Sequence, residues 1–119
     1  MPSDTFSIEM TVQKGVSVYS IKGYGTARTA ESLGSLVEKQ MAEKPGDQIW
    51  DFSGCPIINS PGVVAFTLLG VRIEEDYRRR LIVTGLSEIQ HQVFELAGMF
   101  AYIDEEPTLE AALATLAAP

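Results

Sequence analysis

The sequence predicts an α/β domain in which a mixed sheet of four to five strands packs against about four helices. Segments with a period of two residues alternate along the chain with segments whose apolar residues recur every three or four positions. The predicted order is strand, strand, helix, strand, helix, strand, helix, a weakly indicated strand and a last helix. Because 45% of the 119 residues are hydrophobic, one core can form without metals or disulfides, and we expect a single domain over residues 1–119.

The first two predicted strands form a hairpin. The first strand alternates apolar and polar residues, which is typical of a strand with one face in water. Its apolar residues are Phe6, Ile8, Met10 and Val12. Residues 13–15 (Gln-Lys-Gly) supply a turn. In the second strand Val16 and Val18 point one way while Tyr19 and Ile21 point the other, so we expect this strand to lie inside the sheet.

An amphipathic helix is predicted after a break in the chain at the glycines of residues 23–25. Its apolar stripe comprises Ala30, Leu33, Leu36, Val37 and Met41. Thr26 and Thr29 are the two candidates for the residue that caps its start. We expect residues 45–46 (Pro-Gly) to end this helix.

A short strand at residues 48–52, followed by a loop at residues 53–56, is predicted to precede a long helix. Ser60 before Pro61 is a strong signal for a helix start. A serine hydroxyl can accept an amide hydrogen bond there, and proline at the first helical position gives up no useful donor. We therefore expect Ser60 to cap a helix that is apolar at first and becomes charged toward Arg80.

The last part of the chain predicts a strand and two helices. Residues 81–83 form a continuous apolar run, and Ser87 with Gln90 forms a capping box that opens a helix ending at Gly98. The expected buried stripe of this helix is Ile89, Val93, Leu96 and Ala97. A final helix is expected from about Thr108. Its apolar side carries Leu109, Ala112, Leu113 and Leu116.

The charge balance argues against nucleic acid and membranes as partners. Sixteen Asp and Glu residues outnumber nine Lys and Arg residues, so the surface should repel phosphate backbones and anionic lipid. The basic cluster at residues 78–80 follows the acidic run at residues 74–76, which is typical of the solvated end of a helix. The N-terminal residues carry no targeting pattern, and the apolar run at residues 63–71 is too short to cross a bilayer. We therefore expect a cytoplasmic protein.

No residue pattern predicts catalysis, a cofactor or a metal site. His91 is the single histidine, and its spacing from the predicted stripe indicates an exposed position. Cys55 is also alone, without Cys or His spacing for zinc, and a buried or loop thiol is expected. Asp51 and Asp104 have structural explanations as a strand-end and a turn residue. The sequence therefore predicts a protein that is not an enzyme.

Ser60 is the candidate functional residue. A hydroxyl at a helix start is usually a cap, but the same position suits a phosphate, since free amides and the helix dipole both stabilise negative charge. Phosphorylation would add about −1.5 to −2 charges beside the apolar face of a helix. A partner docked there would be disfavoured by the new charge.

Three stretches, taken in order, resemble the STAS family, which is named for sulfate transporters and anti-sigma-factor antagonists. Residues 57–63 (Ile-Ile-Asn-Ser-Pro-Gly-Val) are similar to the family's I-D-S-S-G-L signature between the third strand and the second helix. Residues 81–87 and 93–100 resemble its strand, G-L-S, helix and L-x-G-L pattern, and residues 107–113 resemble its closing helix. The match spans nearly the whole chain.

This resemblance implies a regulator that acts by binding. Bacterial antagonists of this fold bind an anti-sigma factor that is also a serine kinase of the histidine-kinase-like ATPase type, and so free the sigma factor. Phosphorylation of the first serine of the signature switches them off, and a PP2C-type phosphatase restores them. That serine corresponds to Ser60. The partner-binding residues that the resemblance implies are Thr26, Asn59, Ser60, Pro61, Gly62 and Val63.

The chain departs from the family pattern at both expected binding loops. Asn59 and Pro61 replace the acidic residue and the second serine of the signature, and Thr26 replaces an aspartate that often follows the second strand. A second hypothesis is therefore a STAS scaffold, or a subunit of a regulatory complex, that works without phosphorylation. The substitution Ser60→Asp separates the two, since only the first predicts a large loss of partner binding. A small-ligand module is a third hypothesis, although no residue pattern selects a ligand.

Overall fold

A computed structural model describes residues 5–117, so the two ends of the expected domain, residues 1–4 and 118–119, lie outside the described part. The elements in chain order are β1 (Phe6–Gln13), β2 (Val16–Gly25), α1 (Ala27–Glu43), β3 (Gln48–Ile58), α2 (Ser60–Asp76), β4 (Leu81–Thr84), α3 (Glu88–Leu96), a short 3₁₀ helix η1 (Met99–Ala101), β5 (Asp104–Glu106) and α4 (Leu109–Ala117). The predicted α/β class and the order of elements are confirmed, including the weakly indicated fifth strand.

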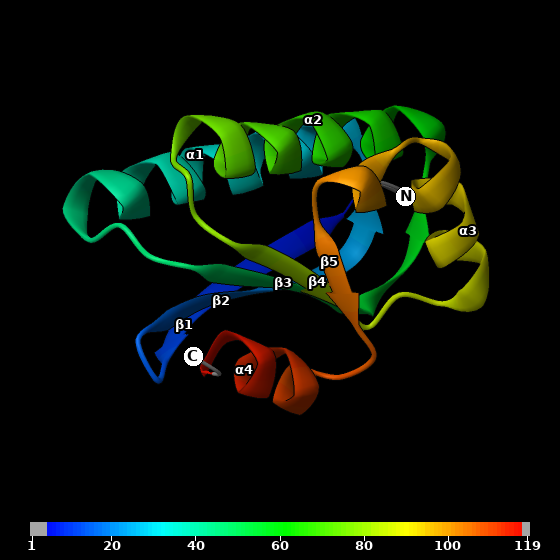
Figure 1. The fold of residues 1–119 in the computed structure, drawn as a ribbon. Coiled ribbons are helices and arrows are strands. Elements are labelled where there is room, and N and C mark those ends of the chain that lie inside the picture. Colours follow the sequence, from blue (N-terminus) through cyan, green and yellow to red (C-terminus); the bar gives the residue numbers. More distant parts are fainter. Residues whose placement is uncertain (1–4, 118–119) are drawn as a thin grey trace.

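The five strands form one sheet in the order β1-β2-β3-β4-β5. Only β1 and β2 are antiparallel, and they are joined through Lys14 and Gly15, whose positive φ angles of 53° and 79° suit a tight hairpin turn. The other strands run parallel to their neighbours. Figure 1 shows α1 and α2 together on one face of the sheet, α4 on the other face and α3 beyond one end. Parallel strands therefore deliver several loops to a single edge.

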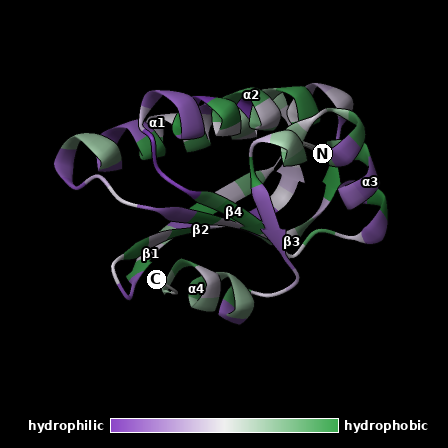
Figure 2. Ribbon diagram, viewed as in Figure 1, coloured by the Kyte–Doolittle hydropathy of each residue, from purple (hydrophilic) through white to green (hydrophobic). Residues whose placement is uncertain are grey.

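The core lies on both faces of the sheet, as expected from the pattern of β2. Tyr19 and Ile21 belong to the larger cluster beneath α1 and α2, whereas Val16 and Val18 belong to the smaller cluster beneath α4. Strand β4, between β3 and β5, is buried along its whole length, and Figure 2 shows it as hydrophobic beside the hydrophilic edge strand β5. The predicted apolar side of α4 packs on the smaller cluster. Among residues 5–117, no helix is long and apolar enough to span a bilayer.

Helix α1 begins at one of the two threonines that were the candidate caps. Thr26 is the N-cap, and its hydroxyl accepts a hydrogen bond from the Thr29 amide at 3.3 Å. In return, the Thr29 hydroxyl oxygen accepts from the Thr26 amide at 3.0 Å, which completes a capping box. Four of the five predicted stripe residues are buried, but Leu36 remains 38% exposed at the margin of the helix. The helix ends at Glu43, before the predicted Pro-Gly break.

Strands β2 and β3 are longer than the sequence predicts. The predicted break at residues 23–25 and the predicted loop at residues 53–56 are both wrong, because both segments lie within strands. Tyr24 and Gly25 of β2 pair with residues 57 and 58 of β3, and Gly54 of β3 pairs with Lys22 of β2. The register of the pairing shifts twice, between Ser20 and Lys22 and again between Lys22 and Tyr24. A Cβ atom on Gly54 would lie 2.9 Å from Cγ of Lys22, so this glycine permits close packing between strands rather than a turn. Asp51 consequently lies within β3 and not at its end.

Helix α3 buries a different side from the one predicted. All four residues of the predicted buried stripe are exposed, namely Ile89, Val93, Leu96 and Ala97. The buried residues are Gln90 and Phe94. Phe94 packs beside Phe52 at 5.9 Å between ring centroids, and the Gln90 side chain donates to the Cys55 carbonyl at 2.8 Å. A buried amide with a satisfied hydrogen bond and one aromatic ring outweigh the apolar periodicity of the helix. The predicted capping box and Gly98 in the left-handed region are confirmed.

The charged segment after α2 is solvated as predicted, but it is not helical. The helix ends at Asp76, and the exposed residues 78–80 lead into β4. Arg80 lies 3.5 Å from Asp104 across the sheet edge. Asp104 begins β5, so its prediction as a turn residue is wrong. The short edge strand therefore accommodates an acidic residue that the sequence pattern assigns to a turn.

Candidate functional site

The loops that follow β2 and β3 meet at one edge of the sheet. Because these strands are parallel, Gly25 lies opposite Ile58 at their carboxyl ends. The Asn59 amide then donates to the Gly25 carbonyl at 3.0 Å, which joins the two loops directly. Thr26 starts α1 and Ser60 starts α2 on either side of this hydrogen bond. The structure therefore brings together both loops in which the sequence predicted binding residues.

Asn59, rather than Ser60, caps α2. The Asn59 side-chain oxygen accepts from the Gly62 amide at 2.8 Å, and its backbone is extended, as at an N-cap. Ser60 and Pro61 are thus the first two helical residues, and the prediction of Ser60 as the cap is wrong. Asparagine and serine are about equally good caps, so the residue types alone do not fix the boundary. Within the described chain, the Ser60 hydroxyl makes no hydrogen bond.

The six residues that the family resemblance implies divide into two groups by exposure. Ser60 and Pro61 are exposed, and Asn59 is half-buried. Thr26, Gly62 and Val63 are buried, the first in its capping box and the last in the main core. A visiting molecule can therefore contact Ser60 and Pro61 directly, while the buried residues fix their position.

Gly62 allows the start of α2 to pack against β2. A Cβ atom at this position would lie 2.5 Å from the Gly25 carbonyl oxygen, which is closer than real contacts allow. The same carbonyl accepts a hydrogen bond from the Asn59 amide, so the loop and the first turn of α2 both contact one backbone group. The missing side chain of Gly62 is therefore a condition for the geometry around Ser60.

The surface next to Ser60 is partly apolar. Val64 and Leu68 are exposed on α2 at the four-residue spacing that places them on one side of the helix. Leu68 also borders a shallow groove of about 510 Å³ between α1 and α2, which carries Glu31 and Arg72. A charged group added at Ser60 would stand at the end of this apolar strip.

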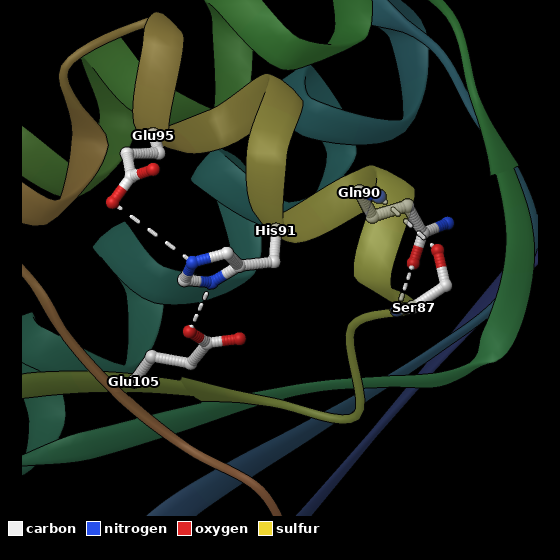
Figure 3. Close-up of polar contacts among 5 residues, drawn as sticks. All are labelled: Ser87, Gln90, His91, Glu95 and Glu105. Carbon is white, nitrogen blue, oxygen red and sulfur yellow. Dashed lines mark hydrogen bonds and ion pairs between the residues drawn. The ribbon is translucent and has the colours of Figure 1, made fainter.

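A second group of polar contacts fixes α3 (Figure 3). In the capping box, the Ser87 amide donates to the Gln90 side-chain oxygen at 3.0 Å, and the Gln90 amide donates to the Ser87 hydroxyl at 3.1 Å. His91 Nδ1 lies 2.5 Å from Glu105 Oε1, and His91 Nε2 lies 4.0 Å from Glu95 Oε2. The imidazole also stacks on Phe100. These contacts tie α3 to β5.

The predicted exposed position of His91 holds only in part, since the side chain is 39% exposed but has polar partners on two elements. The i, i+4 spacing of His91 and Glu95 indicates the weaker contact from sequence. The stronger contact with Glu105 joins residues 14 positions apart, and only the tertiary fold reveals it. In residues 5–117, no three His, Cys, Asp or Glu side chains form a group that could hold a metal ion.

Cys55 is a buried residue of β3, which confirms the expected buried thiol. Its Sγ lies 3.7 Å from the Ile57 carbonyl oxygen. Burial raises the pKa of the thiol from its ordinary 9.0 to about 11, because a thiolate is poorly solvated inside the protein. The residue is thus a small core side chain held mainly in its neutral form.

The arrangement defines a small α/β protein with a hairpin at one sheet edge and two adjoining helix N-termini. The family model of the STAS domain matches residues 7–112. The chain therefore belongs to the STAS domain family, as the sequence resemblance predicted. A comparison with curated protein sequences gave no match.

Solved structures confirm the fold. An anti-sigma factor antagonist from Mycobacterium paratuberculosis is similar with a TM-score of 0.78 and 20% identity, over 99% of this chain and 98% of that chain. A Ser-to-Glu variant of RsbS from Moorella thermoacetica also has a TM-score of 0.78, with 12% identity over 92% and 93% of the two chains. The phosphorylated form of the Bacillus cell fate determinant SpoIIAA has a TM-score of 0.67 and 20% identity, over 93% and 98%.

Substituting Gly62 tests the packing of the two loops. We expect Gly62→Ala to lower the free energy of unfolding by about 1–3 kcal/mol, because the added methyl group meets the Gly25 carbonyl. The matched control is Gly34→Ala in α1, where the nearest atom to a Cβ is 3.6 Å away. This control should stabilise the protein by about 0.5–1 kcal/mol. Urea denaturation measures both, and equal effects would contradict the proposed close approach.

A negative charge at Ser60 should stabilise the folded protein. The first turn of α2 holds no acidic residue, so Ser60→Asp adds a favourable interaction with the helix dipole of about 0.3–1 kcal/mol. The control Thr11→Asp adds the same charge to an exposed position of β1, which is not at a helix N-terminus. Urea denaturation at low and high salt should show a gain for Ser60→Asp alone, reduced by salt. A loss of stability would show that the first turn cannot hold the charge.

The Cys55 thiol should be protected from alkylation in the folded protein. A pKa of about 11 in place of 9.0 leaves about 100-fold less thiolate at neutral pH, and burial limits access further. Since the folded pKa is the higher one, the contribution of the thiol to stability is fully present below pH 9.0 and is lost as the pH rises toward 11. Iodoacetamide labelling followed by mass spectrometry should be fast only in urea. Rapid labelling of the native protein would place the thiol at the surface.

Proposed function

We propose that this protein is an anti-sigma factor antagonist that binds an anti-sigma factor at the Ser60 edge of the sheet. Phosphorylation of Ser60 releases the partner. The observation that carries this proposal is the exposed, unbonded hydroxyl of Ser60 at the first position of α2. Membership of the STAS family supports the binding role, and the fold shared with a phosphorylated SpoIIAA structure is consistent with the switch.

The proposed switch acts through charge. A phosphate on Ser60 would be stabilised by the positive end of the α2 dipole, so the modification is compatible with the fold. It adds about −1.5 to −2 charges next to the exposed Val64 and Leu68, in a chain that already carries a net charge of −7. A partner that buries this strip would have to desolvate the phosphate, and binding would weaken.

The proposed kinase is the anti-sigma factor itself, of the histidine-kinase-like ATPase type, and a PP2C-type phosphatase reverses the reaction. The structural role of Asn59 is compatible with phosphorylation of the neighbouring serine. Asn59 caps α2 through a side-chain oxygen, as an aspartate would, so the loop keeps its geometry without the acidic residue of the family signature. Ser60 is the one hydroxyl-bearing residue between positions 58 and 63, and the modification is therefore assigned to it.

A phosphorylation-independent scaffold is the second candidate function, and Pro61 favours it. The proline lies directly after Ser60 inside the first turn of the helix and fixes φ there. A kinase that binds its substrate in an extended form would have to unwind this turn. In that case the Ser60 edge serves as a permanent docking surface.

Phosphorylation and binding assays test the proposal. Incubation with ATP and the histidine-kinase-like ATPases encoded near the gene should place one phosphate on Ser60, and Ser60→Ala should remain unlabelled. Ser60→Asp should weaken binding to the same ATPase by about tenfold or more, whereas Ser60→Ala and Thr11→Asp should bind as the wild type does. Because Ser60→Asp is expected to stabilise the fold, unfolding would not explain a loss of affinity.

The outcomes separate the candidate functions. Label on another residue would remove the switch at Ser60. Full binding by Ser60→Asp would favour the scaffold. Failure to bind any anti-sigma factor would overturn the proposed class of partner.

A further inference from the structure

An apolar stripe of α3 is turned toward solvent. Ile89, Val93 and Leu96 are 73%, 39% and 89% exposed, and their spacing places them on one side of the helix. Apolar residues with this spacing normally face the core of a protein. Here the core side of α3 is occupied by Gln90 and Phe94 instead. The stripe therefore has no partner within residues 5–117.

The stripe continues onto the end of β3. Ile57 is 58% exposed, and a shallow pocket of about 230 Å³ lies between it and the residues Ile89 and Val93 of α3. We call the set Ile57, Ile89, Val93 and Leu96 the α3 patch. Contiguous exposed apolar residues of this kind mark interaction sites on proteins.

The α3 patch stands on a rigid support. The Gln90 side chain ties α3 to the Cys55 carbonyl of β3, and His91 ties it to Glu105 of β5 (Figure 3). Ser87 fixes its first turn through the capping box. A helix that is capped at its start and held against two strands is preformed, so binding there costs little ordering of the helix.

The charges around the α3 patch select its occupant. Helix α3 carries the exposed Glu88 and Glu95 and no Lys or Arg, and its one imidazole lies against Glu105 with a longer contact of 4.0 Å to Glu95. A second copy of the chain, packed about a two-fold axis through α3, would bring like-charged helices together in a protein of net charge −7. A basic helix would instead pair its charges with these carboxylates while its apolar side covers the stripe.

We propose that the α3 patch is a docking site for a basic amphipathic helix of a protein partner. The site goes beyond the proposed function, because it uses α3 and the end of β3 rather than Ser60 and α2. It gives the protein a second attachment surface beside the one that carries the switch. The partner contacts the patch through apolar residues at helical spacing, and the carboxylates of α3 favour a partner with positive charge.

Peptide binding tests this site. The probe is a helical peptide of about five turns with leucines along one side and lysines flanking them. Two control peptides are used. One contains the same residues as the probe in scrambled order, and the other has glutamates in place of the lysines. We expect only the probe to bind, and NMR chemical shift changes to centre on the α3 patch. Preferential binding of the glutamate peptide, or equal binding of the scrambled one, would overturn the proposal.

Substitutions locate the binding surface. Leu96→Glu and Ile89→Glu should each weaken probe binding by about tenfold or more, and both sites are exposed enough to leave the fold intact. The matched control Leu68→Glu makes the same change on the exposed side of α2 and should bind as the wild type does. A loss confined to Leu68→Glu would move the site to α2 and overturn the proposal.

Two further measurements distinguish the alternatives. Sedimentation of the protein alone should show a monomer, and a dimer that Leu96→Glu dissociates would assign the α3 patch to a second copy of the chain. Ser60→Asp should leave probe binding unchanged, so failure of the proposed switch and failure of the α3 site give different results. Loss of probe binding in Ser60→Asp would show that the two surfaces are one.

Discussion

One backbone carbonyl organises the edge of the sheet on which the candidate site is built. The carbonyl of Gly25 accepts the Asn59 amide, and Gly62 approaches it closely enough to exclude a side chain. These contacts hold the end of β2, the end of β3 and the start of α2 in one position. Because Asn59 caps α2, the Ser60 hydroxyl is not needed as a cap and remains exposed.

The sequence predicted the fold well where periodicity and capping agree. The α/β class, the element order and the Ser87 capping box could all be inferred from local patterns, and the cap of α1 could be narrowed to Thr26 or Thr29, since each depends on residues a few positions apart. The family resemblance was likewise sound over nearly the whole chain. The prediction of a buried Cys55 also held, because a lone cysteine without ligands or a base behaves as a small apolar residue.

The failures have a common physical cause, which is that contacts between distant segments override local preference. Gly25 and Gly54 suggest a break and a loop, yet their missing side chains allow β2 and β3 to continue side by side. In α3, the hydrogen bond from Gln90 to a strand 35 positions earlier in the chain decides which side of the helix is buried. The contact between His91 and Glu105 is equally invisible to a local pattern. The candidate site was therefore located from sequence, but its cap and the α3 patch were not.

The junction at Gly25 also bears on the departures from the family signature. The bond between Asn59 and Gly25 joins two main-chain groups, and such a bond does not depend on which side chain its donor residue carries. The junction also does not involve the side chain of Pro61, which is exposed at the start of α2. The departures from the family signature at positions 59 and 61 therefore leave the main-chain junction intact in this chain.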